Sequence, residues 1–274
     1  MHSAKTIKQK IGLISGSGKF PFLFAKAARK KGYDVTSIAI RNNTDSRLKR
    51  YVDHIKWFKI SEFRKIFEFL NNESIENVVM AGQIKPHTLF NKEIFQDEEL
   101  RKLIVDLEDR RADSIFSAIA LKLKEAGVKL LDSTIFLEDY LPKKGILTCG
   151  EPSSEIWEEI NFGFQIAKEM GRLDIGQTVV VKSKAIVAVE SMEGTDATIR
   201  RAGNIANSGC VVIKVSKPKQ DMRFDIPVAG PRTIKNLIRI RAKCLAFESG
   251  KTLLIDRERC VKEANRHKIA IVAV

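Results

Sequence analysis

The chain opens with a strand, a glycine turn and a helix, and this pattern constrains the fold more than any other. Residues 11–18 are an apolar run followed by Gly-Ser-Gly, and residues 22–31 have helical periodicity. Pro21 suits a first helical turn, where no amide donor is needed, and Gly32 suits the end of the helix. Residues 33–40 form the next apolar run. This is a βαβ unit, which predicts a parallel sheet.

The rest of the first half extends this sheet. We expect strands at 52–59, 77–81 and 128–131 and helices at 61–72 and 97–126, with Ser61 and Asp113 as helix caps. The pattern break that begins near residue 141 marks a domain boundary. We therefore predict a Rossmann-like α/β domain with a parallel sheet at residues 1–140.

The second half predicts a mixed α/β domain at residues 141–274. The expected elements are a helix capped by Ser154, a hairpin turning at Ser183-Lys184, a helix at 197–207 capped by Asp196, a strand at 210–215, a helix at 233–247, a strand at 252–255, a helix at 257–268 and a strand at 269–274. Two of these strands end in charged loops, which we expect to share one rim of the sheet.

The composition favours anionic partners. The 274 residues include 48 Lys+Arg against 34 Asp+Glu, a net charge of +14, which suits phosphorylated small molecules or an anionic lipid surface. A nucleic-acid partner is disfavoured, because no zinc, RRM or basic-zipper pattern is present and only 7% of residues are aromatic. Four cysteines without a CxxC pair indicate reduced thiols in the cytoplasm, and no apolar run of about 18 residues predicts a membrane span.

The turn at Gly16, Ser17 and Gly18 is a candidate ligand site. Its backbone amides precede a helix, where they can face a phosphate. No acidic residue follows the strand at residues 33–40, which disfavours NAD. Gln83 and Lys85 follow the strand at 77–81 and would open on the same edge, whereas His87 is expected to be an ordinary surface residue.

The stretch from residue 189 to 233 is the expected chemical centre. It interleaves acids and bases with Gly, Pro and Thr: Glu190, Glu193, Asp196, Asp221 and Asp225 with Arg200, Arg201, Lys214, Lys217, Lys219 and Arg223. Carboxylates can hold a divalent cation and position water, while the cations can neutralise phosphate. The alternative is two surface loops with solvated charges. Asp196 has a structural explanation as a helix cap, whereas Asp225 follows no helix-start pattern.

Several motifs resemble the LpxI family of UDP-2,3-diacylglucosamine pyrophosphohydrolases. They are Asp174-Ile175-Gly176-Gln177, Glu193-Gly194-Thr195-Asp196, Lys217-Pro218 with Gln220-Asp221-x-Arg223-x-Asp225-x-Pro227, Gly230-Pro231, Gly16 with Gly18 and Pro21, and Gly82-Gln83. The resemblance implies hydrolysis of UDP-2,3-diacylglucosamine to UMP and 2,3-diacylglucosamine 1-phosphate (lipid X) in lipid A biosynthesis. It also implies Mg²⁺ and two α/β domains with the substrate between them.

From the residues and the resemblance together we hypothesise a catalytic set and a binding set. Asp225 leads the catalytic carboxylates, with Asp221 and Asp196 assisting, and Asp225 and Asp221 hold the metal. The predicted substrate-binding residues are Gly16, Ser17, Gly18, Gln83, Gln177, Thr195, Lys214, Lys217, Gln220 and Arg223. Phe20, Phe22 and Phe24 could face the acyl chains, although core packing is the better explanation for at least two of them.

Two other functions stay open. A non-catalytic protein could carry the acylated sugar nucleotide or lipid X, and a Rossmann-type oxidoreductase is disfavoured by the missing acid. The basic surface is expected to make transient contact with the inner membrane from the cytoplasm. The sequence leaves the number of subunits open, a homodimer included.

Overall fold

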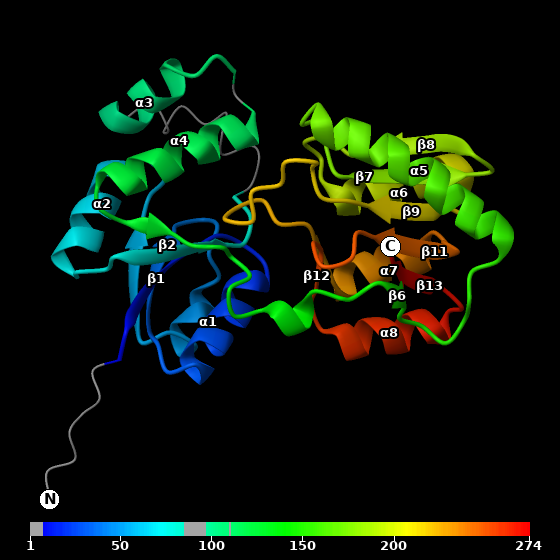
Figure 1. The fold of residues 1–274 in the computed structure, drawn as a ribbon, viewed down its shortest axis with the longest axis horizontal. Coiled ribbons are helices and arrows are strands. Elements are labelled where there is room, and N and C mark those ends of the chain that lie inside the picture. Colours follow the sequence, from blue (N-terminus) through cyan, green and yellow to red (C-terminus); the bar gives the residue numbers. More distant parts are fainter. Residues whose placement is uncertain (1–7, 85–96, 110) are drawn as a thin grey trace, which may run out of the picture. The chain divides into compact units, whose positions relative to one another are not determined.

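The structure is a computed structural model that describes residues 8–84, 97–109 and 111–274 (Figure 1). The chain divides into two compact units: unit 1 is Met1–Glu138 with Met222–Asp225, and unit 2 is Asp139–Asp221 with Ile226–Val274. Lys85 and His87 lie outside the described residues. Each unit is α/β and has its own sheet, which confirms the predicted fold class.

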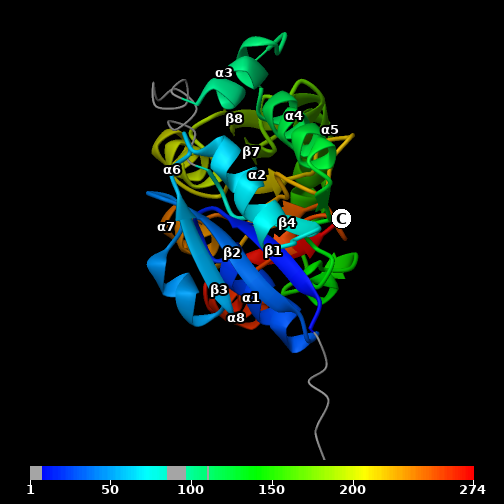
Figure 2. The ribbon, with the colours of Figure 1, turned by 90° about the vertical axis from the view of Figure 1, so that its left-hand side faces the viewer.

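Unit 1 contains a five-stranded parallel sheet. Its strand order is β3-β2-β1-β4-β5, with bounds β1 Lys10–Ser15, β2 Asp34–Ile40, β3 His54–Phe58, β4 Asn77–Ala81 and β5 Lys129–Leu130. Figure 2 shows β1, β2 and β3 side by side. This order reverses direction between β1 and β4, the place where doubly wound sheets bind ligands beyond the carboxyl ends of their strands.

Helices cover both faces of this sheet. Helix α1 (Phe20–Lys30) lies on one face, and α2 (Phe63–Asn72) and α4 (Ala112–Glu125) lie on the other, with α3 (Glu98–Val105) beside them (Figure 1). Pro21 is in the first turn of α1, and Gly32 beyond its end has φ +88°, so both predicted boundaries are confirmed. Phe63, Ile66 and Leu70 are buried, as the amphipathic pattern of α2 predicts.

The predicted caps in unit 1 are wrong by one or two residues. Glu62, not Ser61, precedes α2, and its carboxylate accepts from the amide of Lys59 at 2.8 Å. Arg111 precedes α4, so Asp113 lies inside the first turn and is not the cap. The single helix expected at residues 97–126 is also wrong, because α3 ends at Val105 and α4 begins at Ala112. Helix α3 is capped by Asp97, which accepts from the amide of Leu100.

Unit 2 contains a six-stranded mixed sheet. Its order is β6-β13-β11-β9-β7-β8, with bounds β6 Gly145–Ile146, β7 Thr178–Lys182, β8 Ala185–Val189, β9 Val211–Lys214, β11 Cys244–Phe247 and β13 Ala270–Ala273. Strands β9, β11 and β13 are parallel, while β7 is antiparallel to both β9 and β8, and β6 is antiparallel to β13. A separate parallel pair is formed by β10 (Val228–Ala229) and β12 (Leu253–Leu254).

Four helices bury the two faces of the unit 2 sheet. Helix α5 (Ser154–Arg172) packs one face through Ile160, Ala167 and Met170. The other face is covered by α6 (Thr195–Ala206), α7 (Pro231–Arg239) and α8 (Arg257–Arg266) (Figure 1). The hairpin turn between β7 and β8 is confirmed, because Ser183 and Lys184 both have φ above +50°.

One predicted helix is half wrong. Helix α7 ends at Arg239, and residues 244–247 form β11 inside the sheet instead of continuing the helix. Arg241 has φ +49°, which turns the chain, and all four residues of β11 are buried. A strand covered on both faces has no alternating pattern, so its sequence cannot be distinguished from a buried helical segment. The predicted cap of α5 is also off by one, since Ser153 precedes that helix.

Within the described residues, no helix is long and apolar enough to cross a membrane.

Candidate functional site

The carboxyl edge of the unit 1 sheet brings two glycine loops together. The turn at residues 16–18 follows β1, and Gly82-Gln83 follows β4. The amide of Ser17 donates to the carbonyl of Gln83 at 2.8 Å, the amide of Gln83 donates back at 3.1 Å, and Ser17 Oγ donates to the same carbonyl of Gln83 at 2.8 Å. The prediction that both loops open on one edge is confirmed. We call residues 16–18, Gly82 and Gln83 the Gly16 edge.

Glycine is required in this edge because two backbones nearly touch. A Cβ atom on Gly82 would lie 2.5 Å from the carbonyl oxygen of Ser17, and its φ is +90°. A Cβ on Gly16 would lie 2.8 Å from the backbone of Gln83. The amides of Ser17 and Gln83 thus each donate to the carbonyl of the other residue, and the Gly16 amide donates to the carbonyl of Ala81 at 2.8 Å, so the Gly16 edge is a narrow backbone ledge whose amides are largely engaged within the protein.

The segment at residues 222–225 packs in unit 1, although by sequence it belongs to the second half. Ser133 is buried and receives it: its amide donates to the carbonyl of Met222 at 2.9 Å, and its Oγ lies 2.7 Å from the carbonyl of Arg223 and 2.6 Å from that of Met80. Phe224 is buried and stacks on Phe116 at 5.3 Å. These contacts hold the segment at the end of β4. Sequence reasoning missed Ser133.

Asp225 is exposed and has φ +53°, the left-handed region that costs a side-chain-bearing residue about 1–2 kcal/mol. Such strain persists only where the surrounding structure imposes it, and it concentrates at functional sites. The anchored Phe224 next to Asp225 supplies that constraint. The structure therefore presents the leading predicted carboxylate on a fixed, strained backbone in unit 1.

A cleft of about 580 Å³ lies beside this segment, within unit 1. Its apolar lining comes from α4 and from the residues around β5: Ala120, Leu121, Val128 and Leu130. Its cations are Lys124, Lys129 and Arg223.

The three phenylalanines considered for the acyl chains lie elsewhere. Phe20 and Phe24 are buried in the core, and Phe22 packs edge-on against Tyr51 at 5.3 Å. Core packing therefore accounts for two of the three phenylalanines, as expected.

Three strands of unit 2 converge on a second edge. Strands β8 and β9 both run antiparallel to β7, which lies between them, so the ends of β8 and β9 meet the start of β7. Glu190 directly follows β8, Lys214 ends β9, and Thr178 begins β7 opposite Lys214. The prediction of one shared rim is confirmed for this pair of strand ends.

These strand ends and the first turn of α6 form a buried polar cluster. Lys214 Nζ donates to Thr195 Oγ1 at 2.7 Å, and Thr195 Oγ1 donates to Glu190 Oε1 at 2.8 Å. Thr178 Oγ1 lies 3.4 Å from Thr195 Oγ1 and 3.5 Å from Lys214 Nζ. Lys214 is 6% exposed and Glu190 9%. We call Thr178, Glu190, Thr195 and Lys214 the Lys214 cluster; sequence reasoning assigned Thr195 and Lys214 to the binding set, named Glu190 in the chemical centre without a role, and did not single out Thr178.

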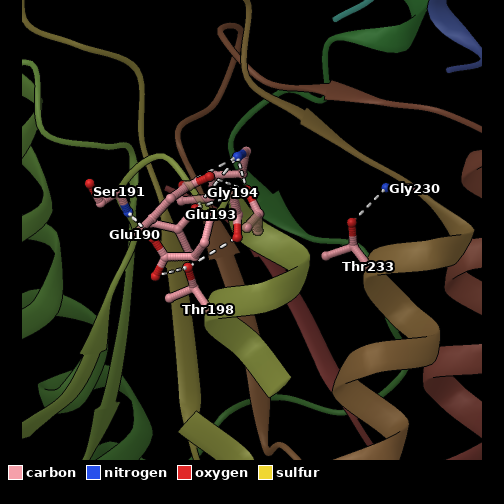
Figure 3. Close-up of polar contacts among 10 residues, drawn as sticks. Glu190, Ser191, Glu193, Gly194, Thr198, Gly230 and Thr233 are labelled. Carbon is pink, nitrogen blue, oxygen red and sulfur yellow. Dashed lines mark hydrogen bonds and ion pairs between the residues drawn. The ribbon is translucent and has the colours of Figure 1, made fainter. Parts of the chain in front are cut away.

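Next to this cluster, the loop between β8 and α6 closes on the Glu193 carboxylate. Figure 3 shows the amide of Ser191 and the hydroxyl of Thr198 reaching Glu193, at 3.1 and 3.3 Å. Arg201 also donates to Glu193 at 2.5 Å. Partial burial favours the protonated acid, but the Arg201 guanidinium and nearby backbone amides outweigh it and lower the pKa of Glu193. Glu193 therefore shapes its own loop.

Asp196 links two helices. The predicted cap is wrong: Gly194, with φ +78°, precedes α6, and Asp196 is the second helical residue. Its Oδ2 pairs with Arg232 Nε at 2.7 Å, and its Oδ1 accepts from Asn236 Nδ2 at 2.8 Å, both on α7. Both carboxylate oxygens contact α7. Asp196 therefore has a structural role, but the role is to join α6 to α7 and not to cap α6.

The base of the loop that follows β9 is fixed by buried charges. Lys217 Nζ pairs with Asp174 Oδ1 at 2.5 Å, and the side chains are 6% and 9% exposed. The amide of Lys217 donates to Gln220 Oε1 at 3.1 Å, and the amide of Val215 donates to the Gln177 carbonyl at 2.9 Å. The structure thus brings three predicted binding residues, Gln177, Lys217 and Gln220, to one short segment.

Glu248 anchors the same segment. Its Oε2 accepts from the amide and hydroxyl of Ser216 at 3.0 and 2.7 Å and from Lys168 Nζ at 2.9 Å. Burial favours the protonated acid, but Lys251, Ser216 and Lys168 outweigh it and lower the pKa of Glu248 to about 2. Sequence reasoning singled out neither Asp174 nor Glu248 as a site residue, because their partners lie far away in the sequence.

The predicted metal ligands are the carboxylates of Asp221 and Asp225. Asp221 and Asp225 lie four positions apart in one loop, and two carboxylates with phosphate oxygens and waters suit Mg²⁺. In the parts of the chain that the structure describes, no group of three or more His, Cys, Asp and Glu side chains converges. Carboxylate oxygens are donors that Mg²⁺ accepts, but Asp221 belongs to unit 2 and Asp225 to unit 1, so their binding of one ion stays a prediction.

The chain is similar to known proteins along nearly its whole length. The family model of the LpxI N-terminal domain matches residues 10–140, and that of the LpxI C-terminal domain matches residues 143–272. UDP-2,3-diacylglucosamine pyrophosphatase LpxI of Caulobacter vibrioides is 28% identical over 278 residues, which cover 97% of this chain and 98% of the relative.

Solved structures give weaker likenesses. Leucoanthocyanidin reductase of Vitis vinifera is 14% identical and matches 54% of this chain and 41% of its own, with a TM-score of 0.28. The biotin carboxylase domain of the Hydrogenobacter thermophilus 2-oxoglutarate carboxylase is 12% identical and matches 72% and 41%, also with a TM-score of 0.28. At these scores neither likeness informs on fold or function.

Proposed function

Because the chain belongs to the LpxI family, we propose that it hydrolyses UDP-2,3-diacylglucosamine to UMP and 2,3-diacylglucosamine 1-phosphate (lipid X) in lipid A biosynthesis. The observation that carries this function is the match of both halves to one family and to a relative of that name over 97% of the chain. In the reaction, the oxygen of a water molecule bonds to one phosphorus, and the bond from that phosphorus to the bridging oxygen breaks. The protons of the water pass to the phosphate products or to solvent.

Asp225 is the leading catalytic carboxylate in this proposal. A carboxylate orients water and accepts its proton as the new bond forms. The exposure of Asp225, its strained backbone and the anchoring of the adjacent Phe224 support this role. Asp221 assists from the same loop. Asp196 was predicted to assist as well, and its pairing with Arg232 and Asn236 makes it the weakest of the three.

Mg²⁺ belongs to the proposal through Asp225 and Asp221, which would hold it together with the substrate. When bound, such an ion screens the charge of the diphosphate. The protein's own cations supply the remaining positive charge: Arg223 beside Asp225, and Lys214 and Lys217 in unit 2. The buried pairing of Lys217 with Asp174 fixes the start of the loop that carries the two carboxylates.

The remaining predicted binding residues would contact the uracil, the sugars or the phosphates. Gly16, Ser17, Gly18 and Gln83 form the backbone ledge of unit 1, at the switch point where α/β sheets bind ligands. Gln177, Thr195 and Gln220 belong to the unit 2 edge. The apolar and cationic lining of the cleft beside Arg223 supports a place for an acyl chain.

The amphiphilic substrate also suggests where the enzyme works. We place it in the cytoplasm, in transient contact with the inner-membrane surface, and the net charge of +14 supports attraction to anionic lipid. Sedimentation with anionic against neutral vesicles tests this contact. A homodimer is a further proposal, which light scattering in solution tests.

The hydrolase is tested by following UMP release from UDP-2,3-diacylglucosamine in detergent, with Mg²⁺ and with EDTA. We expect turnover with Mg²⁺, loss with EDTA and recovery when Mg²⁺ is restored. A folded protein that binds the substrate and releases no UMP would be a carrier, which would overturn the proposal.

The role of Asp225 is tested by Asp225→Ala, which should lower kcat by about 10³-fold or more, the scale of losing an essential acid–base group. Asp256→Ala is the matched control, because Asp256 is also an exposed aspartate with positive φ (+52°). It should keep near wild-type turnover. Full activity of Asp225→Ala would move the catalytic role to another residue.

A further inference from the structure

Glu190 is a charged member of the Lys214 cluster to which the proposed chemistry gives no role. It is 9% exposed, and its Oε2 is buried without a hydrogen-bond partner among the described residues. A buried carboxylate oxygen in that condition is costly, so it requires an explanation. The nearest cation is Lys214, whose Nζ lies 3.9 Å from Oε2.

The two charges form an ion pair but are not hydrogen-bonded to each other. A distance of 3.9 Å exceeds the range of about 2.7–3.2 Å for an N–H···O hydrogen bond. The Thr195 hydroxyl lies between them instead, 2.8 Å from Glu190 Oε1 and 2.7 Å from Lys214 Nζ. A threonine hydroxyl has a single hydrogen, and this one is donated to Glu190. Thr195 therefore has no hydrogen left to donate to a phosphate oxygen.

We propose that Glu190 and Thr195 are positioning residues that hold Lys214 ready for the diphosphate. Glu190 fixes the direction of the Thr195 hydroxyl, and the hydroxyl accepts from Lys214 while it keeps the carboxylate apart from the ammonium group. Lys214 is thereby oriented through the Thr195 hydroxyl, with the carboxylate held at ion-pair distance but outside hydrogen-bond contact. This proposal rests on the proposed hydrolase function and narrows the role of Thr195 to that of a spacer.

The N-terminal end of α6 also favours an anion beside Lys214. Thr195 is the first residue of this 12-residue helix, and the N-terminal end of a helix favours anions. The buried ammonium of Lys214, in a low-dielectric edge, acts in the same direction.

The test is a double-mutant cycle on Thr195→Ala and Glu190→Gln. Without the spacer, Lys214 can close onto Glu190 as a direct pair. We expect Thr195→Ala to lower kcat/KM roughly 10- to 100-fold, mainly through KM, the range for a lost hydrogen bond to a charged group. Glu190→Gln alone should lower kcat/KM less than Thr195→Ala does, because its amide oxygen still accepts from Thr195.

The double variant decides the matter. With no carboxylate left to close onto, Lys214 is released, and Glu190→Gln should restore the activity of Thr195→Ala by about fivefold or more. Losses that add, or a double variant worse than Thr195→Ala, would overturn the spacer. Thr195→Ser, which keeps the hydroxyl, should restore kcat/KM to near wild type; failure of this rescue would also overturn it.

Thr198→Ala is the matched control. Thr198 lies one turn further along α6 and is buried; its Oγ1 lies 3.1 Å from the carbonyl of Gly194 and 3.3 Å from Glu193 Oε1, outside the Lys214 cluster (Figure 3). It should lose stability without a change in KM. A KM effect equal to that of Thr195→Ala would reduce Thr195 to a helix-stabilising residue and overturn the proposal.

Calorimetric titration with UDP gives a readout that does not require turnover. UDP affinity should follow the same order: wild type and Thr195→Ser tight, Thr195→Ala weak, the double variant intermediate. Wild-type protein that releases no UMP contradicts the hydrolase, whereas active wild-type protein with an additive cycle contradicts the spacer alone.

Discussion

The two sheet edges that carry the predicted site residues are built from different materials. The Gly16 edge of unit 1 is backbone against backbone, held by amides and carbonyls of Ser17 and Gln83. The unit 2 edge is made of buried side-chain charge: the Lys214 cluster, the Lys217–Asp174 pair and Glu248 with its partners. A backbone ledge is neutral and depends on shape, whereas a buried charged edge depends on every charge having its partner.

Because the two edges are built differently, we expect them to tolerate different perturbations. Adding a methyl group should damage the Gly16 edge and spare the charged one. Removing a charge, by substitution or by acid, should do the reverse. The three tests below follow from this contrast.

Lys217→Met should have the largest effect. It leaves Asp174 buried without its cation, a change that costs about 3–5 kcal/mol of unfolding free energy. Lys184→Met is the matched control, because Lys184 makes a similar contact with Glu158 at 2.7 Å with both side chains more than half exposed. It should cost less than about 1 kcal/mol by urea denaturation. Equal losses would show that burial does not distinguish the unit 2 edge.

Gly82→Ala should come next. The new Cβ would lie 2.5 Å from the Ser17 carbonyl at a φ of +90°, and strain with overpacking together cost about 2–4 kcal/mol. Gly18→Ala separates the two causes, since Gly18 has φ +91° and nothing within 4 Å of the added atom. It should cost only about 1–2 kcal/mol in the same denaturation experiment. A Gly18 variant as unstable as the Gly82 variant would remove close approach as the reason for glycine.

Acid should act on unit 2 through Glu248. The pKa of this acid is lowered to about 2 in the fold from its ordinary value of about 4.5. A depressed folded pKa gives stability that is present above the unfolded pKa and is lost as pH falls from about 4.5 toward 2. The contribution is about 3 kcal/mol. Glu248→Gln should be less stable at pH 7 and should flatten the decline of unfolding free energy over that interval; parallel curves for the two proteins would contradict the assignment.

Sequence reasoning succeeded where local chemistry decides structure. The βαβ unit at residues 11–40 is punctuated by Pro21 and Gly32, each of which has a backbone reason to stand where it does. Once the parallel sheet was predicted, the meeting of Gly16 and Gln83 at one edge followed from strand direction alone. The rim shared by Glu190 and Lys214 was likewise predictable from two strands that end alike.

Sequence reasoning failed where a position depends on distant partners. Helix caps at Ser61, Asp113, Ser154 and Asp196 were each misplaced by a residue or two, because neighbouring residues can provide the same start. The strand at residues 244–247 was taken for helix because it is buried on both faces. Ser133 meets Arg223 across 90 positions, and no local pattern marks such a contact. The catalytic roles of Asp225 and Asp221, and their metal, stay predictions.

The short return of residues 222–225 to unit 1 has a consequence for the modularity of the protein. A gene split after residue 138 would give a first fragment without Phe224, whose ring completes the core beside Phe116. It would also send Asp225 away with the second fragment. Neither half could be exchanged between relatives by itself, because the second half of the sequence carries residues 222–225 of unit 1. Recombination should therefore preserve the two halves as a single inherited block.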